Sequence, residues 1–426
     1  MNFVLSHNQK QNMKTVIKNI SELIQTEITP RKWVAGKDMS HISTIKDAFI
    51  EVQDGIIKSF GSMENWNGIE DWNSTDIIDA EGGMVFPTYC DSHTHLVFAA
   101  SREGEFVDRI NGLTYSEIAE RGGGILNSAE KLQKVTEDEL FEDAMIRLNE
   151  LIQMGTGAIE IKSGYGLTLD SELKILRVIK RLKENTDVTI KATFLGAHAI
   201  PKEYKDNKDD YMDLVINEML PIVAKEGLAD YVDIFCEDGY FTIEDTKNLL
   251  TAANKLGLQS KTHVNQFNAI GGVKVSVDLG ALSVDHLEEM EEEDYEALKR
   301  SNCIPTILPS CSFFLRIPYG PAKRMIEEGL AVALATDYDP GSSPSGNMNF
   351  VASLACIQMN MTPEEVINAT TINTAYAMGI EKDLGSICIG KKANLFITKP
   401  IPSYAYLAYS FGHNVIEKVM IAGKLQ

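Results

Sequence analysis

The middle of the chain alternates apolar, strand-like runs with amphipathic, helix-like stretches, and this alternation constrains the fold more than any other feature. Eight apolar runs follow one another: Gly83–Tyr89, Ala158–Ile161, Thr189–Leu195, Tyr231–Phe235, Gln259–Thr262, Ala281–Val284, Ile304–Leu308 and Ala331–Ala335. Most precede helical patterns, among them Ser171–Glu184, Thr242–Leu256, Glu289–Arg300 and Pro321–Gly329. Eight is the number of strands that closes a parallel β/α barrel. The alternation alone leaves an open, doubly wound sheet as the alternative.

The two ends of the chain carry a different pattern, in which short β-like runs are separated by turn residues. Near the N-terminus these runs are Thr15–Ile20, Ala48–Val52 and Gly55–Phe60. Asp54-Gly55 predicts a tight hairpin between the last two. Near the C-terminus the runs are Gly385–Ile387, Lys392–Ile397 and Val415–Ala422. We therefore expect both ends to pair in one small antiparallel sheet beside the barrel, with residues 1–13 as a disordered extension.

The charge and the cysteines exclude several classes of protein. A formal net charge of −21 argues against sequence-independent nucleic-acid binding, which needs a basic face, and against docking on an anionic membrane. No run approaches the about 20 apolar residues of a membrane helix. The six cysteines are scattered without a Cys-x-x-Cys pair. They predict reduced thiols in a cytoplasmic protein rather than a disulfide framework.

Histidines gather where the predicted strands end. Five of the eight fall at or just beyond the C-terminal end of a strand, namely His93, His95, His198, His263 and His286. Asp337 follows the eighth strand in the same way. In a parallel barrel these ends meet at one mouth, where catalytic groups are expected.

His93-Thr94-His95 is the strongest single motif. Residues two apart in extended backbone point to the same side, so both imidazoles can bind one metal ion. The pattern is weak alone, but the apolar run before it and the later strand-end histidines strengthen it. His263 and Asp337 complete a shell of three imidazoles and one carboxylate, which suits Zn²⁺ or Fe²⁺.

A metal ion held there would lower the pKa of a bound water towards neutrality. Asp337 could both ligate the metal and take the proton of that water, or it could simply cap a helix. His286 could be a further ligand or a donor to an oxyanion. Its alternative is a core histidine bonded to a neighbouring carboxylate. We expect His198 to contact a ligand, with packing as its alternative.

Other polar residues near the strand ends are candidates for binding an anion. Arg102 could hold a carboxylate through two hydrogen bonds, or it could form a surface ion pair with Glu103 or Glu105. Tyr165 lies between two glycines, which allow its loop to approach a ligand closely. The polar loop that begins at Asp339 could face an anion with its backbone N–H groups.

Five segments connect the chain to a known family: Asp91–Phe98, Gly122–Leu126, Glu160–Leu167, Phe194–Pro201 and Asp285–Glu288. On these segments the chain resembles the imidazolonepropionase family of the amidohydrolase superfamily. The resemblance covers nearly all of the chain after the N-terminal extension. The His-x-His pair is common to the superfamily, whereas the Lys-Ser-Gly-Tyr-Gly and Gly-Ala-His-Ala segments narrow the resemblance to this family.

The resemblance implies an α/β fold, with a metal-bearing barrel over 83–384 and a β-sandwich built from 14–82 and 385–426. It implies hydrolysis of 4-imidazolone-5-propanoate to N-formimidoyl-L-glutamate in histidine degradation, by metal-activated water attacking the ring amide carbonyl. A homodimer is expected at the family level. One Zn²⁺ or Fe³⁺ per subunit would be held by His93, His95, His263 and Asp337.

The resemblance also assigns roles to single residues. Those implied to contact substrate or product are Arg102, Tyr165, His198, Gln266, Asp339, Gly341 and Ser342. Those implied to act in catalysis are His263, His286, Asp337 and Gln266.

Two positions depart from the family pattern. Gln266 stands where many members carry an acidic residue, and it cannot act as a general base. Asp339 stands where the family usually has Asn, and its carboxylate would repel an anionic ligand unless it is protonated or paired. Two other functions stay open. One is a related amidohydrolase acting on another cyclic amide or amidine, and the other is a non-catalytic relative that only binds a ligand.

Overall fold

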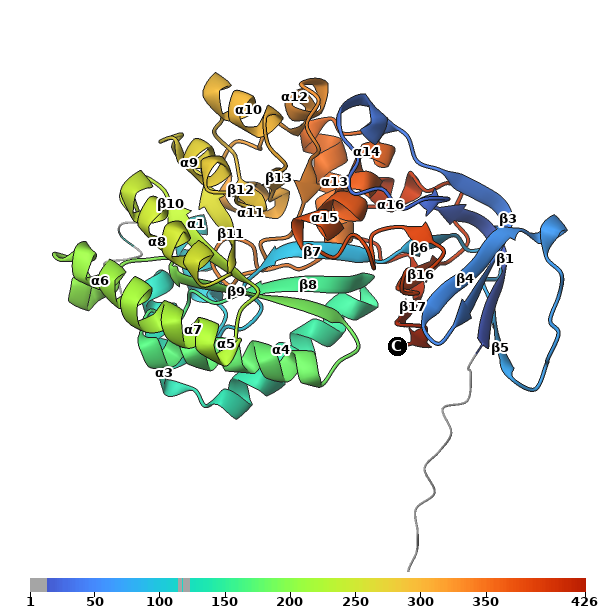
Figure 1. Cartoon of the computed structure of the whole chain (residues 1–426), viewed down its shortest axis with the longest axis horizontal. Coiled ribbons are helices and arrows are strands. Elements are labelled where there is room, and N and C mark those ends of the chain that lie inside the picture. The colour runs from blue at the N-terminus through green and yellow to red at the C-terminus, as the bar shows by residue number, and fades with distance from the viewer. Residues whose placement is uncertain (1–13, 114–116, 118–122) are drawn as a thin grey trace, which may run out of the picture.

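A closed barrel forms the larger part of the computed structural model, which describes residues 14–113, 117 and 123–426 (Figure 1). Eight parallel strands pair in the order β14-β13-β12-β11-β10-β9-β8-β7. These are β7 (Tyr89–Thr94), β8 (Thr156–Lys162), β9 (Thr189–Ala197), β10 (Tyr231–Cys236), β11 (Gln259–Val264), β12 (Ser283–His286), β13 (Ile304–Ile307) and β14 (Ala333–Leu334). The expected parallel barrel is confirmed, and the open sheet is excluded.

The segment after β14 closes the barrel against β7. A parallel bridge joins Thr94 to Tyr338, and the backbone N–H of His95 donates to the Tyr338 carbonyl at 2.8 Å. The N–H of Asp337 donates to the His93 carbonyl at 3.0 Å. Closure therefore brings Asp337 next to the His93-x-His95 motif, 242 positions earlier in the chain (337 − 95).

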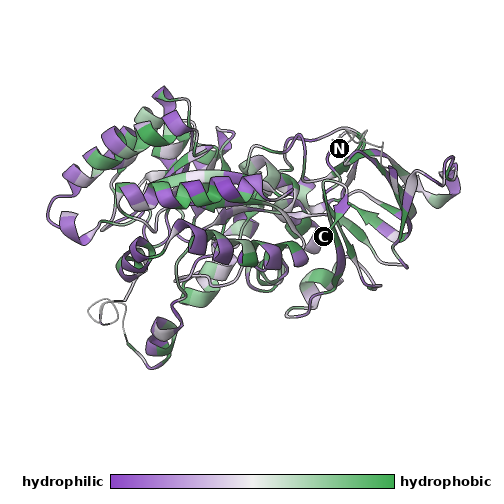
Figure 2. Cartoon of the chain, turned by 90° about the horizontal axis from the view of Figure 1, so that it is seen from below, coloured by the Kyte–Doolittle hydropathy of each residue, from purple (hydrophilic) through white to green (hydrophobic). Residues whose placement is uncertain are grey.

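Most of the helices that surround the barrel bury one apolar side, so purple and green residues alternate around them in Figure 2, whereas the helix over residues 372–377 is buried on all sides. Several begin at a side-chain cap: Thr242 and Asp245 form a capping box on α8, and Thr136 and Glu139 form one on α4. The helices before β12 are α1 (Glu103–Ile110), α3 (Ile125–Lys134), α4 (Glu137–Gln153), α5 (Leu169–Glu184), α6 (Lys208–Leu214), α7 (Leu220–Glu226), α8 (Ile243–Lys255) and α9 (Gly272–Asp278). Those after it are α10 (Glu292–Lys299), α11 (Pro309–Leu315), α12 (Ala322–Glu327), α13 (Met348–Met359), α14 (Pro363–Thr370), α15 (Ile372–Ala377) and α16 (Tyr406–Tyr409).

Both ends of the chain build one satellite sheet, as the pattern predicted. Its order is β18-β17-β16-β6-β1-β3-β4, and β5 also pairs with β1. The strands are β1 (Lys14–Ile24), β3 (Thr44–Gln53), β4 (Ile56–Ser62), β5 (Thr75–Asp79), β6 (Val85–Pro87), β16 (Leu395–Thr398), β17 (Ile416–Ile421) and β18 (Lys424–Leu425). The sheet is mixed rather than antiparallel, because β5 and β6 run parallel to β1. A second, two-stranded sheet pairs β2 (Thr26–Glu27) with β15 (Ile387–Cys388).

The prediction of a single strand over Gly83–Tyr89 was wrong. Val85–Pro87 belongs to the satellite sheet as β6, and the first barrel strand begins only at Tyr89. Between them the N–H of Thr88 donates to the carbonyl of Asn394, the residue just before β16 of the satellite sheet. His93 therefore lies within β7 rather than after it. The expected N-terminal extension, residues 1–13, lies outside the described residues.

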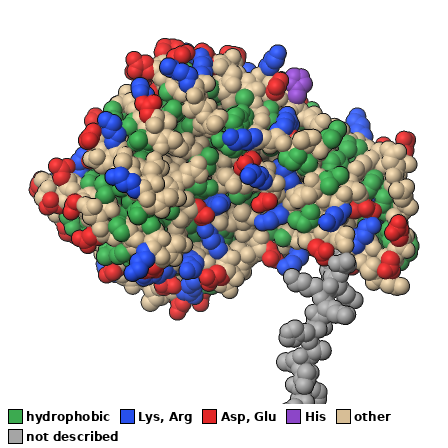
Figure 3. Space-filling view, viewed as in Figure 1, with side chains coloured by type: hydrophobic (Ala, Val, Ile, Leu, Met, Phe, Trp, Pro, Cys, Tyr) green, Lys and Arg blue, Asp and Glu red, His purple; other side chains and the backbone are tan. Residues whose placement is uncertain are grey.

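The surface carries both signs of charge. Acidic and basic side chains are interspersed over the face shown in Figure 3, within a chain whose formal net charge is −21. Among the described residues, no helix combines the length and the hydropathy needed to cross a membrane.

Candidate active site

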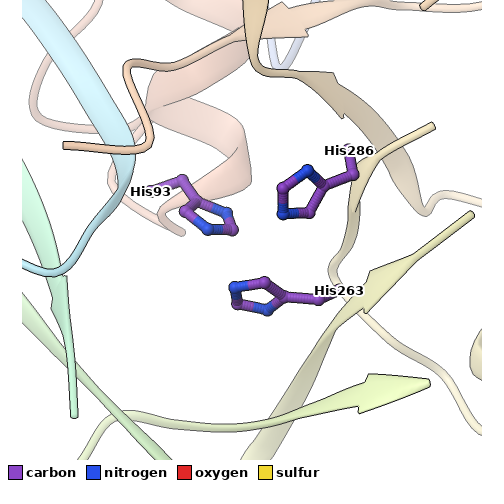
Figure 4. Close-up of side chains that lie close together, drawn as sticks. All are labelled: His93, His263 and His286. Atoms are coloured by element: carbon purple, nitrogen blue, oxygen red, sulfur yellow. The ribbon is translucent and has the colours of Figure 1, made fainter. Parts of the chain in front are cut away.

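Four histidine side chains converge inside the mouth of the barrel. The ring centroids of His93 and His263 lie 4.3 Å apart, and those of His263 and His286 lie 5.3 Å apart. Figure 4 shows these three rings facing a common centre from separate elements. His95 lies 5.6 Å from both His93 and His263 by the same measure. The strand-end histidines therefore meet, as the barrel topology predicted.

Possible ligand atoms within 4.8 Å of one another form four overlapping triads in the described part of the chain. The triads are His93-His263-His286, His95-His198-His263, His93-His95-Asp337 and His286-Cys311-Asp337. Together they contain all four ligands expected from the sequence. They also contain Cys311, which sequence reasoning had not selected among the scattered cysteines.

Two of the histidines present an unpaired nitrogen to the centre of this group. Nδ1 of His93 lies 2.7 Å from Asp285, and Nδ1 of His263 lies 2.9 Å from Asp233. The ring of His263 is not turned for a linear hydrogen bond. Nε2 of both rings is buried without a hydrogen-bond partner. Buried polar atoms without partners are costly, and a carboxylate behind Nδ1 is the usual arrangement of a metal-binding histidine. The donor set therefore fits a transition-metal ion.

Burial keeps most of these imidazoles neutral. It lowers the pKa of His93 well below its usual range, helped by the charges of Lys162 and the neighbouring histidines. Burial lowers the pKa of His95 in the same way, and it lowers that of His198 to about 3. Neutral imidazole is the form that binds metal ions, so these rings are ready to ligate at neutral pH.

His286 differs from the other histidines in the mouth. Burial alone would lower its pKa, but the charge of Glu288 outweighs burial and raises the pKa to about 9. Glu288 lies 3.5 Å from Nδ1, which is an ion-pair contact rather than a hydrogen bond. His286 therefore carries a proton at neutral pH and can donate a hydrogen bond. The structure brings it to the candidate site together with its acidic neighbour.

Asp337 lies beside two of the histidine rings. Its Oδ1 is 3.3 Å from Nε2 of His93 and 3.8 Å from Nε2 of His95. Burial, reinforced by the charge of Asp339, raises its pKa well above the usual value. Its backbone φ of 57° holds it in the left-handed region, away from a regular helix N-terminus. Its side chain faces the histidines, as a ligand would.

A cavity of about 290 Å³ opens beside the histidine cluster. Its polar lining includes Arg102, Tyr165, His198, Gln266, Asp339 and Ser342. Aromatic rings, among them Phe235 and Tyr240, line the other side. All the substrate-contacting residues expected from the resemblance, including Gly341, therefore line one cavity.

Arg102 forms a nearly buried ion pair instead of a surface one. Its Nε and Nη2 both donate to one oxygen of Glu105, at 2.8 and 2.6 Å. The side chains of the two residues are only 9% and 11% exposed. The other Glu105 oxygen accepts the Gly124 N–H at 2.9 Å. Nη1 of Arg102 lies against Gly341, where an added Cβ would be only 2.1 Å away. One edge of the guanidinium is thus fixed, and Nη1 lies along the cavity wall.

A buried carboxylate shapes the loop that carries Tyr165. Glu172 accepts the backbone N–H groups of Gly164, Gly166 and Leu167 at 2.9, 2.7 and 2.8 Å. Gly164 has a φ of 105°, and a Cβ there would lie 2.8 Å from Nδ1 of His198. Glycine is therefore needed for the close approach of this loop to His198. The sequence showed the flanking glycines but gave no signal for Glu172.

His198 and Gln266 lie between the cavity and the histidine cluster. The ring of His198 stacks on that of His95 with centroids 5.1 Å apart, and its Nδ1 lies 3.1 Å from the Gly164 carbonyl. Nε2 of Gln266 lies 3.4 Å from Sγ of Cys311. Each side chain is thus held by a contact away from the cavity, and each also lines the cavity.

Comparisons with known proteins agree with this geometry. A family model described as the amidohydrolase family matches residues 84–425. Curated imidazolonepropionases of Flavobacterium johnsoniae and Christiangramia forsetii are each 58% identical to this chain over 413 residues, covering 97% of it and all of the relative. The imidazolonepropionase of Alkaliphilus oremlandii is 41% identical over 417 residues, covering 97% of this chain and 98% of its own.

Solved structures share the fold at low identity. A guanine deaminase of E. coli superposes with a TM-score of 0.73 at 13% identity, covering 97% of this chain and 99% of its own. An adenosine deaminase of Xanthomonas campestris superposes with a TM-score of 0.71 at 14% identity, covering 97% and 92%. These likenesses extend over the barrel and the satellite sheet together.

Proposed function

The chain belongs to the imidazolonepropionases of the amidohydrolase family, and we infer that it hydrolyses 4-imidazolone-5-propanoate to N-formimidoyl-L-glutamate in histidine degradation. The observation that best supports this reaction is the pair of buried Nε2 atoms without a hydrogen-bond partner, in rings that lie behind His198 in the wall of a cavity also lined by Arg102. One end of the cavity suits a metal-assisted hydrolysis. The other suits a small substrate with a carboxylate tail.

We propose that His93, His95, His263 and Asp337 hold one Zn²⁺ or Fe³⁺ ion per subunit. Three neutral imidazoles and a carboxylate are a common donor set for these metals. Bound there, the metal would supply a water acidic enough to attack an amide carbonyl at neutral pH. The orphaned Nε2 atoms and the carboxylates behind the rings support this assignment.

Residues of the chain would then accept the proton of the water and stabilise the negative charge that develops on the carbonyl oxygen. Asp337, which lies beside the His93 and His95 rings, would accept the proton of the attacking water. The protonated His286 donates a hydrogen bond to the carbonyl oxygen as it becomes negative. Gln266 can hydrogen-bond the ring but cannot take a proton, so proton transfer depends on the other two residues. The ring C–N bond breaks as the leaving nitrogen takes the proton back from Asp337, and the carbonyl carbon becomes a new carboxylate.

The far end of the cavity would hold the propanoate tail. Arg102 offers Nη1 to the carboxylate, and Tyr165 and Ser342 line the same part of the cavity with hydroxyls that donate to Asp339. His198 and Gln266 would contact the ring, and Gly341 leaves room for the Arg102 guanidinium. Fixing both ends of the substrate places its carbonyl carbon over the histidine cluster and can contribute several kcal/mol to catalysis, on the order of 7–11 kcal/mol at most.

Two further proposals have narrower support. All six cysteines are free, and five of them are buried, which is consistent with a cytoplasmic, reducing environment. A homodimer is expected from the family alone, and light scattering of the purified protein would test it.

Loss of imidazolone absorbance tests the proposed reaction. Histidase and urocanase generate 4-imidazolone-5-propanoate in the cuvette, and the metal-replete protein should accelerate its disappearance well above the spontaneous rate. Guanine and hydantoin serve as the alternative rings. Turnover of either, with none of the imidazolone, would favour a different amidohydrolase. No turnover of any ring by a metal-replete sample would favour a protein that only binds its ligand.

A further inference from the structure

A cluster of buried charges lies directly behind the histidines, and the reaction described above does not use it. Its members are Glu160 and Lys162 on β8, Asp233 on β10, Lys261 on β11 and Asp285 on β12. All five are at most 1% exposed. Buried lysines and carboxylates are rare unless each charge is paired, so the cluster is expected to have a specific role.

Lys162 contacts three carboxylates at once. Its Nζ donates to Glu160 Oε1 and to Asp233 Oδ2, each at 2.8 Å, and it lies 3.6 Å from Asp285 Oδ2. The three carboxylates come from three different strands of the barrel. An ammonium group has three N–H donors, so one lysine can serve all three.

The same two aspartate oxygens also face the histidines. Asp233 Oδ2, which contacts Lys162, is the atom 2.9 Å from Nδ1 of His263. Asp285 Oδ2 is likewise the atom 2.7 Å from Nδ1 of His93. Each oxygen therefore lies between the Lys162 ammonium and a histidine ring. The other oxygen of each aspartate accepts separate hydrogen bonds, from the His263 N–H in Asp233 and from the Ser283 hydroxyl in Asp285, so Lys162 is the group that the two histidine-facing oxygens share.

We propose that Lys162 is a positioning residue for the metal ligands, because it holds the two carboxylate oxygens that orient His93 and His263. With each oxygen ionised and fixed, the proton of the ring stays on Nδ1 and Nε2 keeps its lone pair for the metal. Without the ammonium, Asp233 and Asp285 would be two like charges in a buried space and would move apart. Both rings would then turn away from a common centre.

Lys261 provides a matched control. It is as deeply buried as Lys162, and it pairs with the other oxygen of Glu160 and with the Ser92 carbonyl at 3.1 Å. The hydrogen bonds and the ion pair that Lys261 forms within the described part of the chain reach neither Asp233 nor Asp285. Removal of either lysine deletes one buried cation next to Glu160. Only removal of Lys162 releases the oxygens behind the histidines.

The test compares Lys162→Met with Lys261→Met by metal binding, which needs no substrate. Metal-depleted proteins are titrated with Co²⁺ while the visible d–d absorption is followed, and thermal unfolding of the metal-free proteins reports general damage. We expect Lys162→Met to weaken Co²⁺ binding by about 10–100-fold and to change the band shape. Lys261→Met should keep the wild-type band and an affinity within about threefold of wild type.

Two double variants that keep the net charge of the wild type control for loss of folding. Lys162→Met/Glu160→Gln and Lys261→Met/Glu160→Gln each remove one cation and one anion, and neither touches the two aspartates. The same contrast in Co²⁺ affinity is expected between them. Wild-type affinity and spectrum in the Lys162 variants would overturn the proposal, as would an equal loss in the Lys261 variants. The inference rests on the proposed metal site. Because Co²⁺ binding is measured without substrate, a protein that fails to hydrolyse the imidazolone would still show whether Lys162 positions the metal ligands.

Discussion

The hydroxyl of Tyr165 donates a hydrogen bond to Oδ1 of Asp339, 3.0 Å away, and so joins the loop after β8 to the loop after β14. The same oxygen accepts the backbone N–H groups of Gly341 and Ser342, at 2.5 and 2.9 Å. Oδ2 accepts the Ser342 hydroxyl. The carboxylate that we expected to repel a substrate anion is therefore paired, and it shapes the wall of the cavity.

Asp339→Asn should lower KM for the imidazolone or leave it unchanged. The amide oxygen can keep the three hydrogen bonds of Oδ1, and the amide nitrogen can donate to the Ser342 hydroxyl. The substitution removes one negative charge near the propanoate tail. Steady-state kinetics at several substrate concentrations give KM directly. Asp339→Ala, which loses the acceptor, should instead raise KM. A many-fold rise in KM for Asp339→Asn would show that the charge itself is needed.

Gly341→Ala should weaken substrate binding without affecting the metal. The new Cβ would lie 2.1 Å from Nη1 and 2.8 Å from Cζ of Arg102, so the guanidinium must move. We expect KM to rise about tenfold or more, because a displaced charge-assisted hydrogen bond costs about 1.5–3 kcal/mol. Gly104→Ala is the control, since a Cβ there has no atom within 4 Å. Equal KM values for the two variants would contradict the placement of Arg102.

Arg102→Lys should weaken binding of the propanoate tail of the substrate and should affect binding of the ring little. A lysine keeps the charge but cannot reproduce the two N–H bonds to Glu105 that fix the guanidinium. We expect KM for the propanoate substrate to rise about 10–100-fold, from the same cost of about 1.5–3 kcal/mol. The amide of the propanoate tail serves as the neutral comparison, and its KM should change much less. An equal rise in KM for the propanoate and for its amide would show that Arg102 does not bind the carboxylate tail.

The stability of the metal-free protein should depend on pH through His286 and Glu288. The pKa of His286 is about 9 in the folded state, against about 6.5 in an unfolded chain. A raised pKa means that the contribution is fully present below pH about 6.5 and is lost as pH rises through about 9. It amounts to at most about 3 kcal/mol.

Denaturant unfolding of the chelated protein at several pH values measures this contribution. Glu288→Gln should be less stable than wild type at pH 6, and the difference should shrink towards pH 10. Glu289→Gln, at the exposed neighbouring position, should show no such trend. A constant difference between Glu288→Gln and wild type across the range would mean that His286 is not charged by Glu288.

Much of the candidate site could be predicted because the barrel brings strand ends together. His93, His95, His263 and Asp337 all lie at the C-terminal ends of apolar runs, and strand ends can be recognised from local pattern alone. The first strand was misplaced because Gly83–Tyr89 is one continuous apolar run that serves two sheets. Periodicity does not show where a chain passes from one sheet to another.

The charges behind the histidines could not be predicted. Lys162 and Asp233 lie 71 positions apart in the sequence, and His93 and Asp285 lie 192 apart. Each of these residues lies within or next to an apolar run, and the neighbouring sequence does not show which residue its charge pairs with. Their pairing depends on the order of the strands around the barrel. Glu172 is a different case: its three N–H partners lie only 5, 6 and 8 positions earlier, but the path of that loop could not be read from local pattern.

Hydrolysis in ¹⁸O-labelled water tests the central claim most directly. The metal-replete protein should form N-formimidoyl-L-glutamate faster than spontaneous decay, with one ¹⁸O in the carboxylate that comes from the ring carbonyl. A chelator, or Asp337→Asn, should return the rate to the spontaneous level. Label in a formyl oxygen would show attack at the ring amidine carbon, and a rate no faster than spontaneous decay would show no catalysis. Either result would contradict the account.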